Sequence, residues 1–569
     1  MEQQSFVFNL YENPIMQETK MASELVFEKI GFNKWDSDHI QADYLINHPV
    51  IYILYNQKLS QAYIGQTVHV KRRLNEHLKN PQRKMHNQTI IIGDERFHQS
   101  ATYNIETNLI NYFIAENQFK LQNVSQTVKT QMHNYYQKEY YNQEIFMQIW
   151  KRLKQEHIVE QTLENLRNKD TYKLSPYREL SEQQLEVKNS VIEFCKKHAK
   201  KTTPHVLLIE GNAGTGKSVL LSSLFNTIQD YANDDSSNLN GTNNYLLVNH
   251  SEMLKTYQSI AKSLPNLKKK NFLKPTSFIN KTVDPNTKPA NIVLVDEAHL
   301  LLTKEDSYNN FRYANQLEEI IKRSAVTIVI FDPRQVLKIK SYWNKQMLNE
   351  ITEKYHTKKF LLTDQFRMDA GPEIINWIDS FLSKKLVKIP TVSNNAYDLQ
   401  IFSDIHQLKK AIEDKNQEFG LSRMVSTFDY EHKKDGEIYY VEADGLKMPW
   451  NITRNNTTWA EEVHTIQEVG SIYTIQGFDL NYVGVILGPS IGYDEKTDQI
   501  LIYVTKYKDV GAFTSRTDFS NEKIKQIKEE IILNSLNVLM KRGIHGLYIY
   551  ATDPKLRARL LSCRPDAGS

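Results

Sequence analysis

This 569-residue sequence has very little cysteine, no long apolar run and no large surplus of charge of either sign. Its two cysteines, Cys195 and Cys563, lie too far apart in the chain to build a disulfide framework or a zinc cage. No apolar run approaches the roughly 18 residues that a membrane span needs. The first residues also lack a basic start followed by an apolar stretch, which argues against a secretory signal. We therefore expect a cytoplasmic protein that does not contact a membrane.

The charges are nearly balanced, since 71 Lys and Arg face 67 Asp and Glu and give a net charge of +4. Composition alone therefore says little about nucleic acid, and any basic surface must be local. With 40% hydrophobic and 24% charged residues the chain is typical of a globular protein. Its length predicts about three or four domains.

Short apolar bursts separated by longer amphipathic stretches begin after Pro176. Continuous Val, Ile and Leu runs of about five residues are typical of strands buried on both faces. The helical stretches between them predict parallel sheets and hence an α/β fold. The bursts read "HVLLIEG" (205–211), "YLLVNH" (245–250), "NIVLVDEAH" (291–299), "VTIVIFD" (326–332), "FLLTDQFR" (360–367), "YVGVILG" (482–488) and "LYIYATD" (547–553).

Two other segments have a clear local prediction. Residues 131–170 lack Gly and Pro, which predicts one or two connecting helices that serve as a linker. The polar tract 231–244, "YANDDSSNLNGTNN", predicts an exposed loop.

The strongest chemical signal is "GNAGTGKS", which directly follows the first burst and precedes the helical "VLLSSLF". Glycines let successive backbone N–H groups converge on phosphate oxygens, a lysine reaches the outer phosphates, and a hydroxyl can ligate magnesium. The strand, loop and helix context favours a phosphate-binding loop over a glycine-rich turn. Its candidate nucleotide-binding residues are Gly211, Gly214, Thr215, Gly216, Lys217 and Ser218.

A pair of carboxylates follows the strand "IVLVDEAH". The C-terminal ends of parallel strands are where α/β sheets place ligands. Asp296 is placed to hold magnesium together with Ser218, and Glu297 to polarise the attacking water. An acidic strand end that caps the next helix would account for one carboxylate, but not for the pair together with the loop.

Polar residues also follow several of the later apolar runs, and each of them alone could be a solvated surface group. In order, the series resembles superfamily 1 helicases and translocases, and within them the Schlafen-type helicase family of prokaryotes, over about residues 171–560. The resemblance implies two RecA-like domains, 171–360 and 361–569, that clamp one ATP between them. These polar residues are Asp332 and Gln335 in "FDPRQ", Gln365 and Arg367 in "TDQFR", Gln476, Gly477 and Asp479 in "YTIQGFD", and Arg542 in "MKRGIHG".

The same resemblance implies roles for these residues. Gln184, in "LSEQQ", would read adenine, and Gln335 would sense the γ-phosphate and couple it to nucleic acid. Arg367 and Arg542 would act as arginine fingers from the second domain. Gln476, Gly477 and Asp479 would bind nucleotide, with Asp479 at the ribose position. The segment 245–257, "YLLVNHSEMLKTY", occupies the place of a strand contact, with an ordinary buried strand and helix as the alternative.

An earlier stretch, residues 50–78, holds the tyrosine-bearing runs "VIY" and "YIG", ten residues apart, and then a basic cluster. Arg73 and His77 are four residues apart and so face the same side of a helix. The pattern resembles the GIY-YIG nuclease family, with Val50 in place of the first glycine. A tyrosine-rich hairpin over a solvated basic helix is the alternative.

This second resemblance implies a nuclease domain at 48–130 after an N-terminal extension, 1–47. Phosphodiester hydrolysis needs a nucleophilic water, charge stabilisation at phosphorus and help for the leaving group. The remaining local histidines, His69, His86 and His98, are expected on the surface. The implied roles are Tyr52 as base, Tyr63 orienting it, Arg73 on the phosphate, His77 in proton transfer and Glu106 as the metal ligand. Asn123 follows Glu106 in the order in which the family's site residues occur.

The sequence thus predicts a nucleic-acid-dependent ATPase fused to a metal-dependent endonuclease, with ATP and Mg²⁺ as cofactors and Mn²⁺ as an alternative at the nuclease site. DNA is favoured over RNA as the partner. Architecture suggests defence against phage, with defence-system proteins as further partners. The alternative is an ATP-gated binding or remodelling protein in repair or replication, in which the nuclease module only holds DNA.

Overall fold

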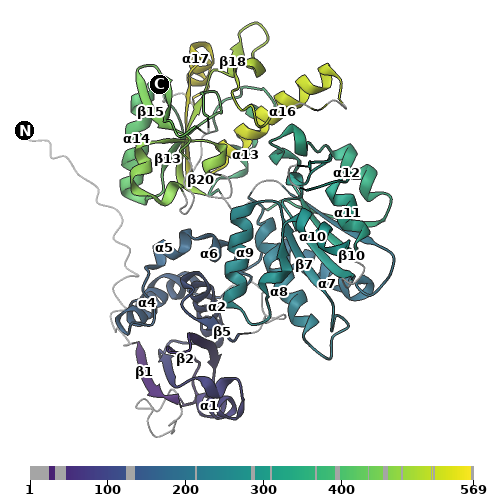
Figure 1. The fold of residues 1–569 in the computed structure, drawn as a ribbon. Helices are drawn as coiled ribbons and strands as arrows, with labels where there is room; N and C mark the ends of the chain where they lie inside the picture. Colours follow the sequence, from purple (N-terminus) through teal and green to yellow (C-terminus); the bar gives the residue numbers. More distant parts are fainter. Residues whose placement is uncertain are drawn as a thin grey trace, which may run out of the picture. The chain divides into compact units, whose positions relative to one another are not determined.

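The structure is a computed structural model that describes residues 25–32, 46–123, 135–211, 214–283, 289–307, 310–364, 368–390, 397–433, 435–452, 459–475, 479–513, 516 and 519–564. The described residues form two compact units (Figure 1). The first contains the chain up to Asn123, residues 135–172 and residues 263–265, and the second contains the remainder. Each unit is described by itself.

The first unit is built on a five-stranded sheet in the order β1-β4-β2-β3-β5. All its pairings are antiparallel except that of β3 with β5. The predicted hairpin is confirmed, and its register sets Tyr52 of β2 opposite Gly65 of β3. Helix α1 follows the hairpin as predicted. The elements are β1 (Val26–Gly31), β2 (Val50–Asn56), β3 (Gln61–Thr67), α1 (Val70–Lys79), η5 (Arg83–Met85), β4 (Gln88–Gly93), α2 (Gln99–Glu116) and β5 (Lys120–Leu121).

The segment predicted to connect the domains is helical from residue 138 onward, with a break at 156–162. Its aromatic side chains pack on α2, since the ring of Tyr112 lies 5.2 Å from Phe146 and 5.3 Å from Trp150. This segment therefore completes the core of the first unit. Its helices are α3 (Lys138–Tyr140), the π-helix η6 (Tyr141–Ile145), α4 (Phe146–Gln155), α5 (Leu163–Asn168) and α6 (Asp170–Lys173).

The first half of the second unit is a six-stranded, wholly parallel sheet in the order β11-β6-β10-β9-β7-β8. Alternate residues of its strands, such as Val206 and Val293, share one hydrophobic cluster with Phe278 of α10 and Ile320 of α11. The strands are β6 (His205–Gly211), β7 (Asn244–Val248), β8 (Phe272–Leu273), β9 (Ala290–Asp296), β10 (Ser324–Phe331) and β11 (His356–Leu362). The helices are α7 (Glu182–His198), α8 (Lys217–Ala232), α9 (Ser251–Ser263), α10 (Pro275–Thr282), α11 (Gln316–Lys322) and α12 (Lys345–Thr352).

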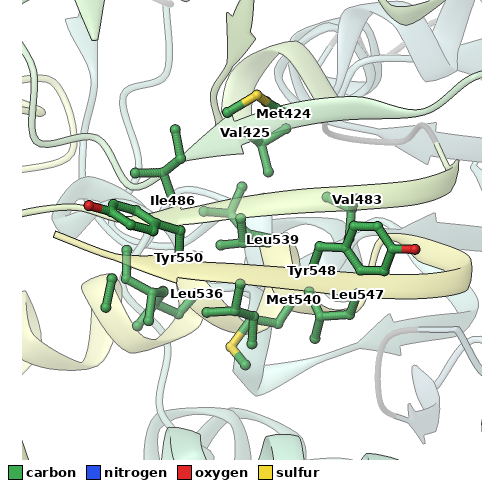
Figure 2. Close-up of a cluster of buried hydrophobic side chains, with 14 of the residues drawn as sticks. Met424, Val425, Val483, Ile486, Leu536, Leu539, Met540, Leu547, Tyr548 and Tyr550 are labelled. Atoms are coloured by element: carbon green, nitrogen blue, oxygen red, sulfur yellow. The ribbon is translucent and has the colours of Figure 1, made fainter. Parts of the chain in front are cut away.

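The second half carries a seven-stranded sheet in the order β12-β20-β17-β13-β16-β15-β14, parallel except for the β14–β15 pair. Figure 2 shows side chains of β13, β17 and β20 meeting those of α16 in its core. The strands are β12 (Asp398–Ile401), β13 (Arg423–Ser426), β14 (Tyr439–Ala443), β15 (Leu446–Trp450), β16 (Val469–Gly470), β17 (Leu480–Leu487) and β20 (Gly543–Ala551), with a separate hairpin of β18 (Ile491–Asp494) and β19 (Gln499–Ile502). The helices are α13 (Pro372–Leu382), α14 (Ile405–Phe419), α15 (Ile472–Ile475), α16 (Asn521–Met540) and α17 (Pro554–Ser562).

All seven apolar bursts are strands, and the predicted α/β fold with two parallel-sheet domains is confirmed. The polar tract at 231–244 is a loop between α8 and β7, again as predicted. Where the structure describes the chain, none of its helices has the length and apolarity to cross a bilayer.

Candidate active sites

The phosphate-binding loop joins β6 to α8, which begins at Lys217. Gly214 and Gly216 have φ angles of +87° and +70°, a region that residues with a Cβ seldom adopt. The buried Lys217 Nζ donates to the carbonyl of Gly211 at 2.7 Å and to Asp332 Oδ2 at 3.3 Å. The loop thus holds its lysine at the carboxyl end of the parallel sheet.

Asp296 and Ser218 meet beside this loop, as the sequence predicts. The Ser218 hydroxyl donates to Asp296 Oδ1 at 3.3 Å, and the hydroxyl of Tyr257 donates to Oδ2 at 2.7 Å. Asp296 is fully buried, and its burial raises the pKa of the carboxyl group. Oxygen donors of these two types are ligands that Mg²⁺ prefers, so the pair fits that ion. Tyr257 carried no signal in the sequence.

Glu297 follows at the end of β9 with φ of +49°. Its Oε2 lies 3.0 Å from Nε2 of the buried His299. Burial lowers the pKa of His299 to about 4, so the imidazole is neutral at pH 7. The two adjacent carboxylates therefore have different partners, with Asp296 held by Ser218 and Tyr257 and Glu297 held beside His299.

Gln335 reaches the same carboxylate as the loop lysine. Its Nε2 donates to Asp332 Oδ2 at 2.7 Å, the oxygen that also accepts from Lys217. Burial would raise the pKa of Asp332, but the charge of Lys217 and the hydrogen bond from Gln335 lower it below its usual value. Asp332 is therefore an anionic link between Lys217 of the loop and Gln335, a link that its place at a strand end did not reveal.

Gln184 lies against the phosphate-binding loop. Its Nε2 donates to the carbonyl of Thr215 at 3.1 Å, and its Oε1 accepts from the N–H of Ser181 in a capping box that starts α7. These contacts fix the loop backbone. The expectation that Gln184 reads adenine stays a prediction.

Two predicted residues of the second sheet lie together. Arg542 is buried, with its NH1 atom 3.6 Å from Asp479 Oδ1. Arg367, Gln476 and Gly477 lie outside the described residues, so their predicted roles remain predictions.

The nuclease candidates Tyr52, Arg73 and His77 form one hydrogen-bonded chain. Arg73 Nε donates to the Tyr52 hydroxyl oxygen at 3.3 Å, and that oxygen lies 2.8 Å from His77 Nε2. The imidazole tautomer sets the roles in this second contact: His77 accepts the Tyr52 proton at Nε2 when its own proton is on Nδ1. A second Arg73 nitrogen pairs with Glu76 at 2.9 Å.

Protonation states follow from burial. Burial raises the pKa of Tyr52 well above its usual value, and burial with the charges of Arg73 and Arg83 lowers the pKa of His77 to about 3. At neutral pH the site therefore contains a protonated tyrosine beside a neutral imidazole.

Tyr63 lies against His77, with ring centroids 5.0 Å apart, and the guanidinium of Arg83 sits 3.6 Å above its ring centre. Arg83 is thus a second cation at the site that the sequence did not single out, because it stands in the short 3₁₀ helix η5 outside the quoted motifs. The expectation of a surface position is wrong for His86, which is fully buried and bonded through Nδ1 to the Arg83 carbonyl.

The two remaining candidates have different surroundings. Glu106 of α2 is buried, and its charge contributes to raising the pKa of Tyr52. Asn123 forms two hydrogen bonds with the backbone of β3: its side chain donates to the Ile64 carbonyl at 2.7 Å and accepts from the Ile64 N–H at 3.2 Å. Asn123 therefore holds the strand that carries Tyr63.

Position 65 must be a glycine because any side chain there would collide with Tyr52. A Cβ at this position would fall 2.5 Å from Cζ of Tyr52 and closer still to its hydroxyl. We expect Gly65→Ala to slow strand cleavage at least about tenfold, because Tyr52 must leave its place between Arg73 and His77. The matched control is Gly31→Ala in the same sheet, where a Cβ meets no atom within 4 Å. Plasmid nicking measures both, and a Gly65→Ala protein as active as the control would contradict this geometry.

Comparison with known proteins matches both parts of the chain. Residues 204–553 match the family model for the Schlafen group 3, DNA/RNA helicase domain, and residues 48–127 match that for the GIY-YIG catalytic domain. An uncharacterized protein of Saccharomyces cerevisiae is 40% identical over 414 residues, which cover 67% of this chain and 90% of that protein. A crystal structure of Pif1 helicase from Candida albicans aligns with 12% identity and a TM-score of 0.27, covering 67% of this chain and 96% of that one.

Proposed function

Because the chain belongs to the Schlafen group 3 family of DNA/RNA helicase domains and also carries a GIY-YIG catalytic domain, we propose that it couples nucleic-acid-dependent ATP hydrolysis with endonucleolytic cleavage, of DNA in preference to RNA. The observation that supports the proposal best is that each domain presents its own hydrogen-bonded catalytic set. Lys217, Asp332 and Gln335 are joined in one domain, and Tyr52, Arg73 and His77 in the other.

In the ATPase site, Lys217 neutralises charge on the outer phosphates and Glu297 orients and polarises the attacking water. Ser218 and Asp296 would hold Mg²⁺, which neutralises phosphate charge when bound. Gln335 reads the presence of the outer phosphate, because the Lys217 ammonium that binds it shares the Asp332 carboxylate with the Gln335 amide. Arg542 and Arg367 stabilise transition-state charge from the second domain.

In the nuclease site, the Tyr52 oxygen is placed to take a proton from the attacking water as its own proton passes to His77, a transfer that requires the bound anionic phosphate to raise the pKa of His77 from its value of about 3. Arg73 is already hydrogen-bonded to that oxygen and presents its guanidinium to the phosphate. Among the described residues no group of three or more His, Cys, Asp or Glu side chains forms a ready metal cage. Glu106 would hold Mg²⁺ or Mn²⁺, which supplies charge neutralisation at the phosphate.

A cavity of about 370 Å³ in the second unit supports binding of a nucleic-acid strand. It is lined by Asn249 and His250 after β7, by Lys338 and Lys340 after η10 (Pro333–Gln335), and by Tyr473 of α15. The exposed lysines suit a phosphate backbone and the tyrosine suits base stacking, a combination that binds single strands without reading sequence. Of the segment 245–257, Asn249 and His250 line this cavity, whereas the residues of β7 itself are buried.

Glu297→Gln should separate ATP binding from hydrolysis. The amide keeps the shape of the carboxylate but cannot polarise water, so ATP stays bound and holds the ATPase in its closed, strand-gripping state. We expect ATP to tighten binding of a labelled single strand at least about fivefold in this variant, measured by fluorescence anisotropy. Adding Lys217→Ala to the same protein should remove that gain. Equal affinity with and without ATP would argue against coupled closure.

For the biological role we propose destruction of foreign DNA such as phage DNA, because a strand-engaging motor joined to a nuclease suits that task. The test is plaque counts on cells that carry the intact chain or the Glu106→Gln variant. A second candidate, an ATP-gated remodelling protein in repair or replication, is favoured by the relative in yeast, a host that phages do not infect. Strand binding without cleavage by the purified protein would support this second candidate.

A further inference from the structure

One carboxylate of α13, that of Asp379, lies between two cations from different parts of the second unit. Its Oδ1 accepts from Lys541 Nζ at 2.6 Å and lies 2.9 Å from NH1 of Arg334. Arg334 belongs to η10 (Pro333–Gln335), which follows β10 of the first sheet, whereas Lys541 follows α16 and leads into β20 of the second. We call these three residues the Asp379 bridge.

Each cation of the bridge is the chain neighbour of a proposed ATPase residue. Arg334 precedes Gln335, and Lys541 precedes Arg542. Helix α16 also supports the Arg334 side directly, because Asn537 Nδ2 donates to the Arg334 carbonyl at 3.4 Å and Asn534 Nδ2 donates to the Val336 carbonyl at 2.9 Å. The bridge therefore ties the sensor segment of one domain to the arginine-bearing segment of the other.

The two halves of the bridge differ in how easily they break. The Lys541 side chain is 2% exposed, and burial lowers its pKa, so losing the Asp379 carboxylate would leave a buried charge poorly compensated. Arg334 is 45% exposed, and exposed pairs of this kind contribute little and exchange readily with water. Burial would raise the pKa of Asp379, but Lys541 and Arg334 lower it, so the carboxylate is anionic at neutral pH. Asp379 is thus fixed on Lys541, while Arg334 is the contact that can open and close.

We infer that Asp379 is a positioning residue that transmits strand engagement to ATP hydrolysis: the Asp379–Arg334 contact aligns Gln335 with the phosphate when the two domains close on nucleic acid. The inference rests on the proposed ATPase function and adds the residue that couples its two domains. Asp379 touches neither phosphate nor strand in this role, so it should affect turnover of the strand-bound enzyme and leave ATP affinity alone.

The test compares ATPase with and without a saturating single strand. Asp379→Asn should lower the stimulated-to-basal ratio at least about fivefold through kcat, with the KM for ATP within about twofold of the parent value. Arg334→Gln should do the same, and its exposed position makes misfolding a poor explanation. Arg334→Lys should retain the ratio within about twofold, because a single contact to one oxygen needs charge but not a forked donor.

The matched control is Asp498→Asn, which breaks an Asp–Arg pair confined to the second sheet's domain, with Arg559 Nε 2.8 Å from Asp498 Oδ1. It should leave both rates and the ratio unchanged. The inference is overturned if Arg334→Gln keeps the parental ratio, or if Asp379→Asn lowers basal and stimulated rates equally along with its melting temperature. If no nucleic acid stimulates the unmodified protein, the proposed function itself fails, which is a distinct result.

Discussion

Lys217→Ala is expected to lower ATP turnover at least about a hundredfold, equivalent to about 2.7 kcal/mol in the barrier. The ammonium is buried at the start of α8 and directed by the Gly211 carbonyl and by Asp332. Its loss removes the positive charge that the outer phosphates meet and leaves the Asp332 carboxylate without that cation. Binding and hydrolysis should both suffer, since the lysine contacts the phosphates in the ground state and in the transition state.

Steady-state phosphate release with saturating single strand measures this effect. The control is Lys322→Ala, which removes a lysine of the same domain that pairs with Glu319 on the surface of α11. Turnover above a tenth of the parent rate in Lys217→Ala would overturn the assignment of this loop.

Glu106→Gln is expected to abolish strand cleavage, with a loss of at least about a hundredfold. The amide has nearly the same shape as the carboxylate, so the packing of α2 is kept while the negative charge that would hold the metal is lost. ATPase stimulated by nucleic acid should stay within about twofold of the parent value, because Glu106 has no part in the nucleotide site.

The same helix offers a matched control in Glu116, a buried glutamate at the end of α2 whose Oε1 accepts from the N–H groups of Glu160 and Gln161. Glu116→Gln makes the same chemical change at the last residue of α2, outside the set of Tyr52, Arg73 and His77, and should leave cleavage intact. Cleavage by Glu106→Gln at the rate of Glu116→Gln would show that the acidic charge has no catalytic role.

The sequence predicted the strands and motifs well because their causes are local. A parallel strand with both faces buried must be apolar along its whole length, so each burst is visible without knowledge of the partner strands. The phosphate-binding loop is equally local, since Gly214, Gly216 and Lys217 act through neighbouring backbone. In the second sheet, β12, β13 and β16 carry too few residues for such a pattern, and the antiparallel pair β14 and β15 includes exposed residues that interrupt it.

The contacts that complete the sites could not be predicted, because they join residues far apart in the sequence. Tyr257 reaches Asp296 from a helix 39 positions earlier in the chain. Asp379 contacts both Arg334 and Lys541, and Lys541 lies 162 positions after it. His86 was misplaced because a histidine in a polar loop looks solvated until the carbonyl that accepts its hydrogen bond is known. A single sequence shows which groups are available, whereas only the fold shows which of them meet.

The central claim is that one chain carries two separate hydrolytic sites, one for ATP and one for phosphodiester bonds. The most direct test measures phosphate release and strand cleavage on one labelled DNA substrate, with an RNA of the same sequence beside it, for the parent, Lys217→Ala and Glu106→Gln proteins. We predict that the parent cuts DNA in preference to RNA, that Glu106→Gln stops cutting and still hydrolyses ATP, and that Lys217→Ala no longer hydrolyses ATP. Undiminished cutting by Glu106→Gln, or undiminished ATP hydrolysis by Lys217→Ala, would contradict the account.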